Sequence, residues 1–229
     1  MKLVLTCEHA GNEVPEAYRN FFSGAVEVLE THRGFDPGAR DLFQELSGLA
    51  VFSQDYMISR LLVEPNRSLG HEQLFSEFTV PLKDSQKKEI LKEFYLPYRE
   101  YIEGRIRSLI QEGNDILHIS VHTFTPVLNG EVRNANIGLL FDPSRKSEKS
   151  FCEDLKERIL QQDRDHKVRY NYPYLGIDDG FTTYLRQQFP QQYSGIELEV
   201  NQKFVQDNKM EKRLKNDIFE ALSKILSEA

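Results

Sequence analysis

Cysteine is scarce in this sequence, and its scarcity disfavours one class of fold. Only Cys7 and Cys152 are present among 229 residues, and they lie far apart along the chain. Two such residues are too few for a disulfide scaffold and do not have the spacing of a zinc knuckle. A fold that depends on disulfides and a site built on thiolates are therefore both disfavoured.

Long apolar runs are also missing. No stretch approaches the roughly 18 apolar residues that a membrane-spanning helix needs. The first residues, MKLVLTCEHAG, turn polar without the small-residue cleavage site of a signal peptide. We therefore expect a cytoplasmic protein with no membrane partner.

An excess of positive charge is the third absence. The chain has 29 basic and 36 acidic residues and a formal charge of -7, whereas nucleic-acid-binding domains carry basic patches. We expect no nucleic-acid partner and instead a small polar ligand. The 39% hydrophobic and 28% charged fractions are typical of a globular protein, and the length suits one domain, residues 1–229.

Segments rich in β-formers alternate with segments of helical periodicity. The expected strands lie in KLVLTC, AVFSQDY, RLLVEP, ILHISVH, NIGLLFD, KVRYNY and GIELEVN. This alternation predicts an α/β sheet with helices on both faces.

The expected helices follow from apolar spacing and from proline positions. One apolar stripe covers 84–113, with a kink predicted at Pro97. Another helix is expected to begin at Asp36, because Pro37 suits the first helical position. Further helices are expected from about position 147 and over 208–227.

Polar residues that are costly to bury stand at the ends of the expected strands. His9 follows the first strand, His122 follows ILHISV, and Glu199 alternates with apolar residues in GIELEVNQ. Residues beyond the carboxyl ends of strands line the ligand crevice of open α/β sheets, and two histidines with a carboxylate can hold a catalytic zinc. Each also has a structural interpretation, as a hydrogen-bonded histidine or as a carboxylate paired with an arginine.

Two further motifs carry polar residues in suggestive positions. In SRLLVEPNRS, Arg60 precedes and Asn66 and Arg67 follow an apolar run. A guanidinium beside an amide suits recognition of a substrate carboxylate, although surface ion pairs would also explain the arginines. Asp36 in GFDPGARDLF stands where a helix N-cap is expected, and that role alone would explain it.

Seven stretches taken in order resemble the N-formylglutamate amidohydrolase family, in its variants with a CEHA opening. They are TCEHAGNEVP, GFDPGA, SRLLVEPNRS, SVHTFTP, NIGLLFDP, DDGFTTYLR and IELEVNQ, from residue 6 to about residue 202. The resemblance implies a phosphorylase/hydrolase-like three-layer α/β/α sandwich with a mixed, mostly parallel sheet. It also implies kinship with zinc carboxypeptidases and with deacylases of acidic amino acids.

The resemblance implies a zinc site. Relatives bind zinc through a His-x-x-Glu pair and a distant His, which here correspond to His9 and His122. An asparagine, a poor zinc ligand, stands where the Glu of the pair is expected. The third ligand expected from the resemblance is Asp36, and the alternatives are Glu13 and Glu8.

The activity implied by the resemblance is hydrolysis of an amide bond in an N-formyl or other N-acyl amino acid, such as N-formyl-L-glutamate. Glu199 matches the late general base of the relatives better than Glu197 does, and Arg60 would stabilise the oxyanion. Asn66 and Arg67 would bind the substrate carboxylate. Arg133 and Arg186 would be available for a second acidic group.

Two other functions are compatible with the same residues. A non-catalytic ligand-binding or regulatory protein could retain the hydrolase fold; the missing Glu favours this alternative, and the presence of Glu199 counts against it. A cysteine hydrolase would use Cys7 as nucleophile and His9 or His122 as base. We expect Cys7 instead to pack as a small buried residue.

Overall fold

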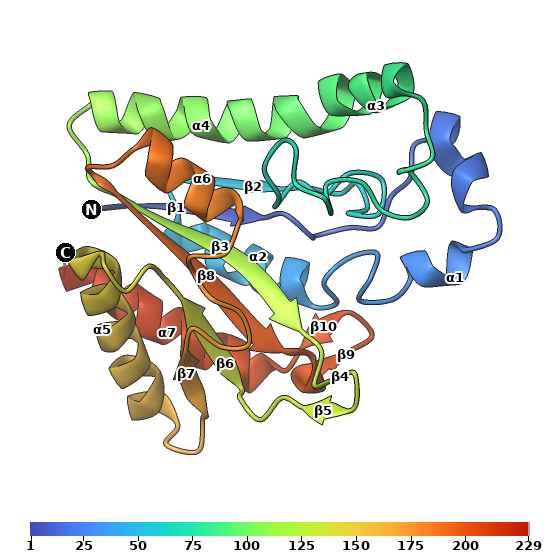
Figure 1. The fold of residues 1–229 in the computed structure, drawn as a ribbon. Helices are drawn as coiled ribbons and strands as arrows, with labels where there is room; N and C mark the ends of the chain where they lie inside the picture. The colour runs from blue at the N-terminus through green and yellow to red at the C-terminus, as the bar shows by residue number, and fades with distance from the viewer. Residues whose placement is uncertain (229) are drawn as a thin grey trace.

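A six-stranded sheet lies between two layers of helices in the computed structural model, which describes residues 1–228 (Figure 1). The strand order is β2 (Phe52–Asp55), β1 (Lys2–Cys7), β3 (Ile116–Phe124), β8 (Tyr193–Asn201), β6 (Ile137–Leu140) and β7 (Val168–Tyr170). The first four strands are parallel; β6 is antiparallel to β8 and parallel to β7. The predicted three-layer sandwich with a mixed, mostly parallel sheet is confirmed.

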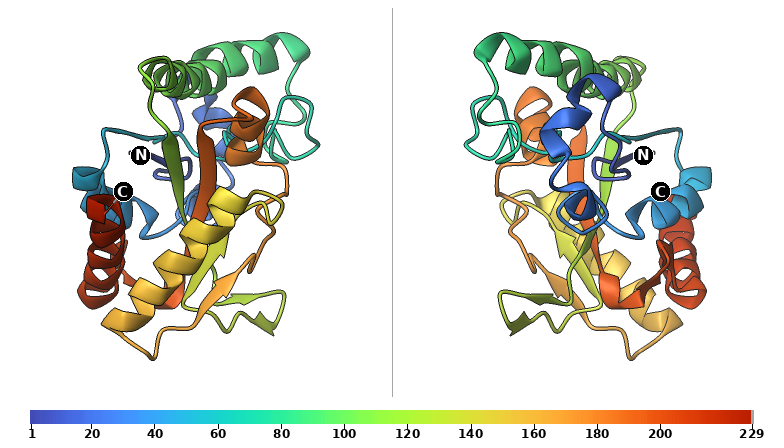
Figure 2. Two further views of the ribbon diagram at one scale, coloured as in Figure 1. Left: turned by 90° about the vertical axis from the view of Figure 1, so that its left-hand side faces the viewer. Right: turned by 90° about the vertical axis from the view of Figure 1, so that its right-hand side faces the viewer.

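Helices cover both faces of the sheet, and strand residues alternate between the two layers. One layer contains α3 (Asp84–Ile90), α4 (Leu96–Gln111) and α6 (Phe181–Gln188), and the other contains α2 (Ala39–Leu46), α5 (Lys146–Gln162) and α7 (Lys212–Glu228) (Figure 2). Leu3, Leu5 and Cys7 pack toward the α2/α5/α7 layer, whereas Val4 packs toward α4 and α6. Within residues 1–228, no helix combines the length and the apolar character needed to cross a membrane.

Short elements complete the chain. They are α1 (Val26–Leu29), the 3-10 helices at Glu16–Phe22, Ser47–Leu49 and Gln202–Phe204, the hairpin of β4 (Val127–Leu128) and β5 (Glu131–Val132), and the hairpin of β9 (Val205–Gln206) and β10 (Lys209–Met210). The second hairpin occupies the first part of the segment predicted as the last helix, so α7 begins at Lys212.

The long helix is confirmed, with its irregularity ahead of the proline. Between α3 and α4 the chain makes a π-helical turn over Leu91–Tyr95, and α4 follows from Leu96 with Pro97 as its second residue. Pro97 has no N–H to donate, and the wider turn accommodates that missing bond.

Two other sequence expectations were wrong. The segment RLLVEP forms turns rather than a strand, because Leu61, Leu62 and Val63 are buried in a separate apolar cluster beside the sheet. The helix predicted from Asp36 begins at Ala39, after Gly38 with a positive φ of 80°. Asp36 is therefore not its N-cap, and its side chain is free to take part in another site.

Candidate metal centre and active site

The strand directions bring the expected ligands to one edge of the sheet. β1, β3 and β8 run parallel, so their carboxyl ends meet, and His122 lies in register with Glu199 on the neighbouring strand. His9 follows β1 directly, and Asp36 is tied to it because Asp36 N donates to His9 O at 2.9 Å. Ligand sites of open α/β sheets lie at this edge.

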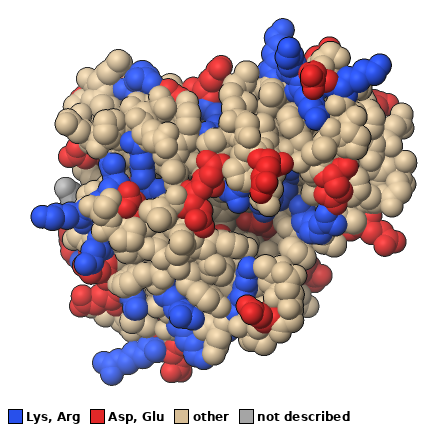
Figure 3. All heavy atoms as spheres, viewed as in Figure 1, with Lys and Arg blue, Asp and Glu red and all other residues tan. Residues whose placement is uncertain are grey.

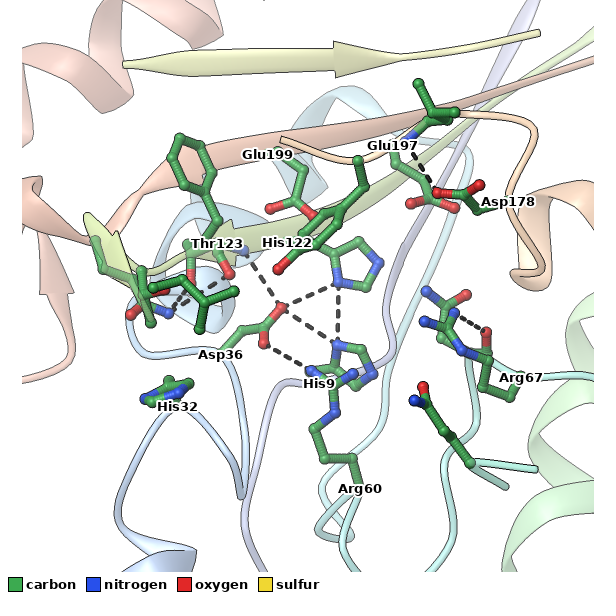
Figure 4. Close-up of a pocket in the computed structure, with 18 of the residues that line it drawn as sticks. His9, His32, Asp36, Arg60, Arg67, His122, Thr123, Asp178, Glu197 and Glu199 are labelled. Carbon is green, nitrogen blue, oxygen red and sulfur yellow. Dashed lines mark hydrogen bonds and ion pairs between the residues drawn. The ribbon is translucent and has the colours of Figure 1, made fainter. Parts of the chain in front are cut away.

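His9, Asp36 and His122 converge with the spacing of metal ligands. His9 Nδ1 lies 3.2 Å from Asp36 Oδ2 and 3.1 Å from His122 Nδ1, and His122 Nδ1 lies 3.0 Å from Asp36 Oδ2 (Figure 4). Donors about 2.0–2.1 Å from a tetrahedral zinc are about 3.3–3.4 Å apart. All three residues are buried. This donor set and spacing fit a divalent metal.

Each histidine has a carboxylate near its other ring nitrogen. His9 Nε2 lies 2.6 Å from Glu64 Oε1, and His122 Nε2 lies 2.8 Å from Ser120 Oγ and 3.3 Å from Glu8 Oε2. Such partners fix the ring tautomer and leave the opposite nitrogen to bind metal. The carboxylates orient both Nδ1 atoms toward Asp36.

The pKa values of these carboxyl groups favour the ionised form. Burial raises the pKa of Glu64, but the charges of Arg60 and His9 outweigh it and hold that pKa well below its usual range. Burial likewise opposes ionisation of Glu8, but the bonds and charge of His122 lower the pKa of Glu8 to about 2. For Asp36 the balance is similar, and His9 and His122 hold its pKa well below the usual value. Ionised carboxylates at Glu64 and Glu8 can orient the histidines, and an ionised Asp36 can bind a metal.

The structure separates the three acidic candidates for the third ligand. Asp36 belongs to the ligand group, with Thr123 N donating to its Oδ2 at 3.3 Å. Glu8 is fully buried behind His122, where it accepts a hydrogen bond from Ser120, so it supports a ligand rather than being one. Glu13 pairs with Ile58 in an isolated bridge and lies outside the group.

A cavity of about 310 Å³ opens over the ligand group. Glu199 lines it, is 4% exposed, and its Oε2 has no hydrogen-bond partner among residues 1–228. Burial raises the pKa of Glu199 to about 8. Glu197 also reaches the cavity but accepts a hydrogen bond from Thr182 Oγ1 at 2.8 Å.

The residues of SRLLVEPNRS line the same cavity. Arg60 Nε donates to Glu64 Oε2 at 2.7 Å, and its Nη1 donates to Asp36 Oδ1 at 3.3 Å. Asn66 Oδ1 accepts a bond from Phe181 N at 2.6 Å, which leaves the amide NH2 as a donor for a ligand. Arg67 Nη1 donates to Asp179 O at 2.6 Å, and its other N–H groups are available.

Of the two arginines expected to serve a second acidic group, neither lines the cavity. Arg133 donates to the OH group of Tyr174 at 3.1 Å, and Tyr174 is itself part of the lining. Arg186 is buried and donates to Glu148 at 2.9 Å, to Gly176 O at 2.6 Å and to Gly195 O at 2.7 Å. Because its guanidinium is occupied inside the fold, Arg186 is not available to a substrate, and the structure does not bring it to the site.

Sequence reasoning missed two residues that support the site. Glu64 lies inside the quoted SRLLVEPNRS motif, but a carboxylate in an expected strand gave no sign that it meets His9. Arg99 of α4 is buried, donates to Pro65 O at 2.8 Å and stacks 4.4 Å from the Phe181 ring. It thereby holds the loop that carries Asn66, and an arginine within a helical stripe does not reveal this role.

Cys7 occupies the apolar core. It packs toward the α2/α5/α7 layer, and burial raises its pKa well above the usual value. A nucleophilic cysteine needs an accessible thiolate, so the structural interpretation of Cys7 holds.

The fold and the residues around the cavity define an α/β protein with a hydrolase-type site. A sequence model of N-formylglutamate amidohydrolase matches residues 1–205, so the chain belongs to that amidohydrolase family. The sequence matches no curated protein.

Two of the similar solved structures share the fold at low sequence identity. A gene product of Agrobacterium tumefaciens has a TM-score of 0.78 and 22% identity, covering 98% of this chain and 91% of the other. N-formylglutamate amidohydrolase from Ralstonia eutropha has a TM-score of 0.71 and 16% identity, with 99% and 93% covered. A metallo-carboxypeptidase from Burkholderia cenocepacia matches with a TM-score of 0.41, 13% identity, and 99% and 56% covered.

Proposed function

We propose that this protein is a zinc-dependent hydrolase that cleaves the amide bond of an N-formyl or other N-acyl amino acid, such as N-formyl-L-glutamate. The observation that carries the proposal is the convergence of His9, Asp36 and His122 beside the buried carboxyl of Glu199. These three residues would hold the metal. When bound, zinc polarises a carbonyl and lowers the pKa of water to about 7.

Glu199 acts as the general base in this proposal. It takes a proton from the attacking water and delivers it to the departing amine. Its buried position keeps bulk water from competing for that proton.

The arginines and the asparagine position the substrate. Arg60, held against Glu64 and Asp36, stabilises the negative charge that develops on the carbonyl oxygen. The free NH2 of Asn66 and the unoccupied part of the Arg67 fork bind the α-carboxylate.

A non-catalytic binding protein is the alternative, and Glu199 separates the two functions. A protein that only binds a carboxylate gains nothing from a buried, unpartnered carboxyl beside two histidines, since burying it is costly. The alternative therefore leaves Glu199 unexplained.

The test is steady-state hydrolysis of N-formyl and N-acetyl amino acids by the zinc-loaded protein, followed by detection of the free amine. We expect Glu199→Gln to lower kcat about 10²–10⁴-fold with little change in KM, the range for loss of a general base. Glu157→Gln, on the exposed surface of α5, is the matched control and should keep wild-type turnover.

Three results would contradict the proposal or part of it. Wild-type turnover by Glu199→Gln would remove the base from the mechanism, and loss of turnover in Glu197→Gln alone would assign that role to Glu197. No hydrolysis of any N-acyl amino acid, together with measurable binding, would favour the non-catalytic alternative.

A further inference from the structure

The pair of Asn66 and Arg67, which we call the carboxylate clamp, lies in a segment without regular secondary structure. Residues 61–70 form turns, so no helix or strand fixes their backbone. Basic and acidic side chains both border the hollow near the middle of the face shown in Figure 3. A carboxylate is therefore recognised by a few fixed donors rather than by a uniformly positive surface, and contacts from elsewhere in the fold must set the position of the clamp.

One such contact ties the clamp to the metal centre. Glu64 Oε1 lies 2.6 Å from His9 Nε2 and accepts a hydrogen bond from Asn66 N at 3.0 Å. The same oxygen thus fixes the spacing between a metal ligand and the clamp. A substrate has to reach both at once, with its carbonyl at the metal and its α-carboxylate at the clamp, and a small displacement of either is costly.

A second set of contacts comes from the residues that lead into α6. Asn66 Oδ1 accepts a hydrogen bond from Phe181 N at 2.6 Å. Arg67 Nη1 donates to Asp179 O at 2.6 Å. The Asp179 carboxylate accepts from Ser68 N at 2.9 Å and from Ser68 Oγ at 2.6 Å. These bonds fix both side chains of the clamp, but none of them holds the Arg67 carbonyl.

Tyr95, from the long helix, holds that carbonyl. Tyr95 OH donates to Arg67 O at 2.7 Å, and Arg99 Nη1 approaches the same oxygen at 3.4 Å. Tyr95 is 2% exposed and does not line the cavity, whereas Arg67 does. Tyr95 therefore reaches a substrate through Arg67.

The π-helical turn accounts for the placement of Tyr95, which is its last residue. Such a turn contains one residue more than a turn of α-helix, and this shifts the side chains on its two sides by about 100° relative to a regular helix. Tyr95 and Arg99, four positions apart, share one face, with the Arg99 guanidinium 5.0 Å from the Tyr95 ring. Both residues bond to the segment that carries the clamp, and π-turns frequently occur at functional sites.

We propose that Tyr95 is a positioning residue: its hydroxyl fixes the Arg67 backbone, so that the clamp meets the α-carboxylate of the substrate at a set distance from the metal. The inference rests on the proposed function, because it concerns the substrate-binding part of that same site. Tyr95→Phe removes only the hydroxyl oxygen and keeps the ring in its apolar cluster. Arg67 O then keeps the longer contact with Arg99.

The experiment measures kcat and KM for N-formyl-L-glutamate and for N-formyl-L-isoglutamine, in which a carboxamide replaces the α-carboxylate and the side-chain carboxylate is kept. In the wild type we expect kcat/KM to favour the glutamate derivative. Tyr95→Phe should raise KM for that derivative about three- to tenfold, the range for one lost hydrogen bond, and change kcat by less than about twofold. Both constants for the isoglutamine derivative should change by less than about twofold.

Tyr193→Phe is the matched control. Tyr193 is also 2% exposed, and its hydroxyl lies 2.7 Å from His118 Nδ1, but neither residue lines the cavity. The control loses a buried hydrogen bond of the same kind, so both variants should lose stability in urea denaturation. Tyr193→Phe should nevertheless keep the wild-type substrate preference, which separates positioning from a structural role.

Three results would overturn the inference: an unchanged KM for the glutamate derivative in Tyr95→Phe, an equal loss for both substrates, or a wild type that does not prefer the α-carboxylate. If neither compound is hydrolysed, the proposed function fails, and calorimetric binding of both compounds to the zinc-loaded wild type and Tyr95→Phe then decides the inference. Weaker binding of the glutamate derivative alone in the variant would support it. Equal weakening, unchanged binding or no binding to the wild type would overturn it.

Discussion

Replacing Glu199 by glutamine should stabilise the metal-free protein even though it removes the proposed base. The side chain is 4% exposed, and burial raises its pKa from the usual 4.5 to about 8. Between these two values the unfolded chain releases the proton while the folded protein keeps it, so stability falls as the pH rises. The penalty from these two pKa values is about 1 kcal/mol at pH 5 and about 3 kcal/mol at pH 7.

Glutamine has nearly the same size and does not ionise, so it removes this penalty. After exhaustive chelation, we expect Glu199→Gln to raise the melting temperature by about 5–10 °C at pH 7 and by no more than about 3 °C at pH 5. Thermal melts followed by circular dichroism measure both shifts. Glu157→Gln on the surface of α5 is the control and should show no such pH dependence.

One result would refute this reasoning. A loss of stability at pH 7 in Glu199→Gln would mean that the folded protein stabilises the ionised carboxylate. Burial would then not control the protonation of Glu199 in the metal-free protein.

Three further predictions test the surroundings of the site. Glu64→Gln should weaken zinc affinity about 10–100-fold, because Glu64 orients His9. Competition with a chromophoric chelator measures the affinity, and an unchanged value would contradict the orienting role. Arg99→Ala should lower the free energy of unfolding by about 3 kcal/mol, because it loses hydrogen bonds to buried carbonyls and stacking on the Phe181 ring. Urea denaturation measures this free energy, and a change below about 0.5 kcal/mol would contradict the prediction. Cys7 in the folded protein should resist iodoacetamide, and rapid alkylation with loss of turnover would revive the cysteine-hydrolase alternative.

Most of the sheet could be predicted from the sequence, because its strands are short apolar runs bounded by polar residues. The RLLVEP run has the same composition but is buried against a loop cluster, so composition alone could not separate the two cases. The start of α2 was misplaced because Asp36 and Pro37 look like a helix start, whereas the Asp36 side chain is held by the histidines.

Residues at the carboxyl ends of strands were the predictable part of the site, although His122 lies within the last residues of β3 rather than beyond it. His9 and His122 follow from that position, and Asp36 follows from the family resemblance. The roles of Glu8 and Glu64 depend on which nitrogen of each histidine faces them, which no local pattern encodes. Arg186 was expected at the site because its charge is visible in the sequence, but its buried partner Glu148 lies 38 positions away.

Metal analysis of the purified protein by inductively coupled plasma mass spectrometry tests whether His9 and His122 bind a metal. We expect about one zinc per chain in the wild type, lost in both His9→Ala and His122→Ala. His166→Ala, at the separate group of Asp163, His166 and Asp217, is the matched control and should keep the zinc. A wild-type protein that takes up no added zinc, or a His122→Ala variant that retains it, would contradict the assignment of the metal centre.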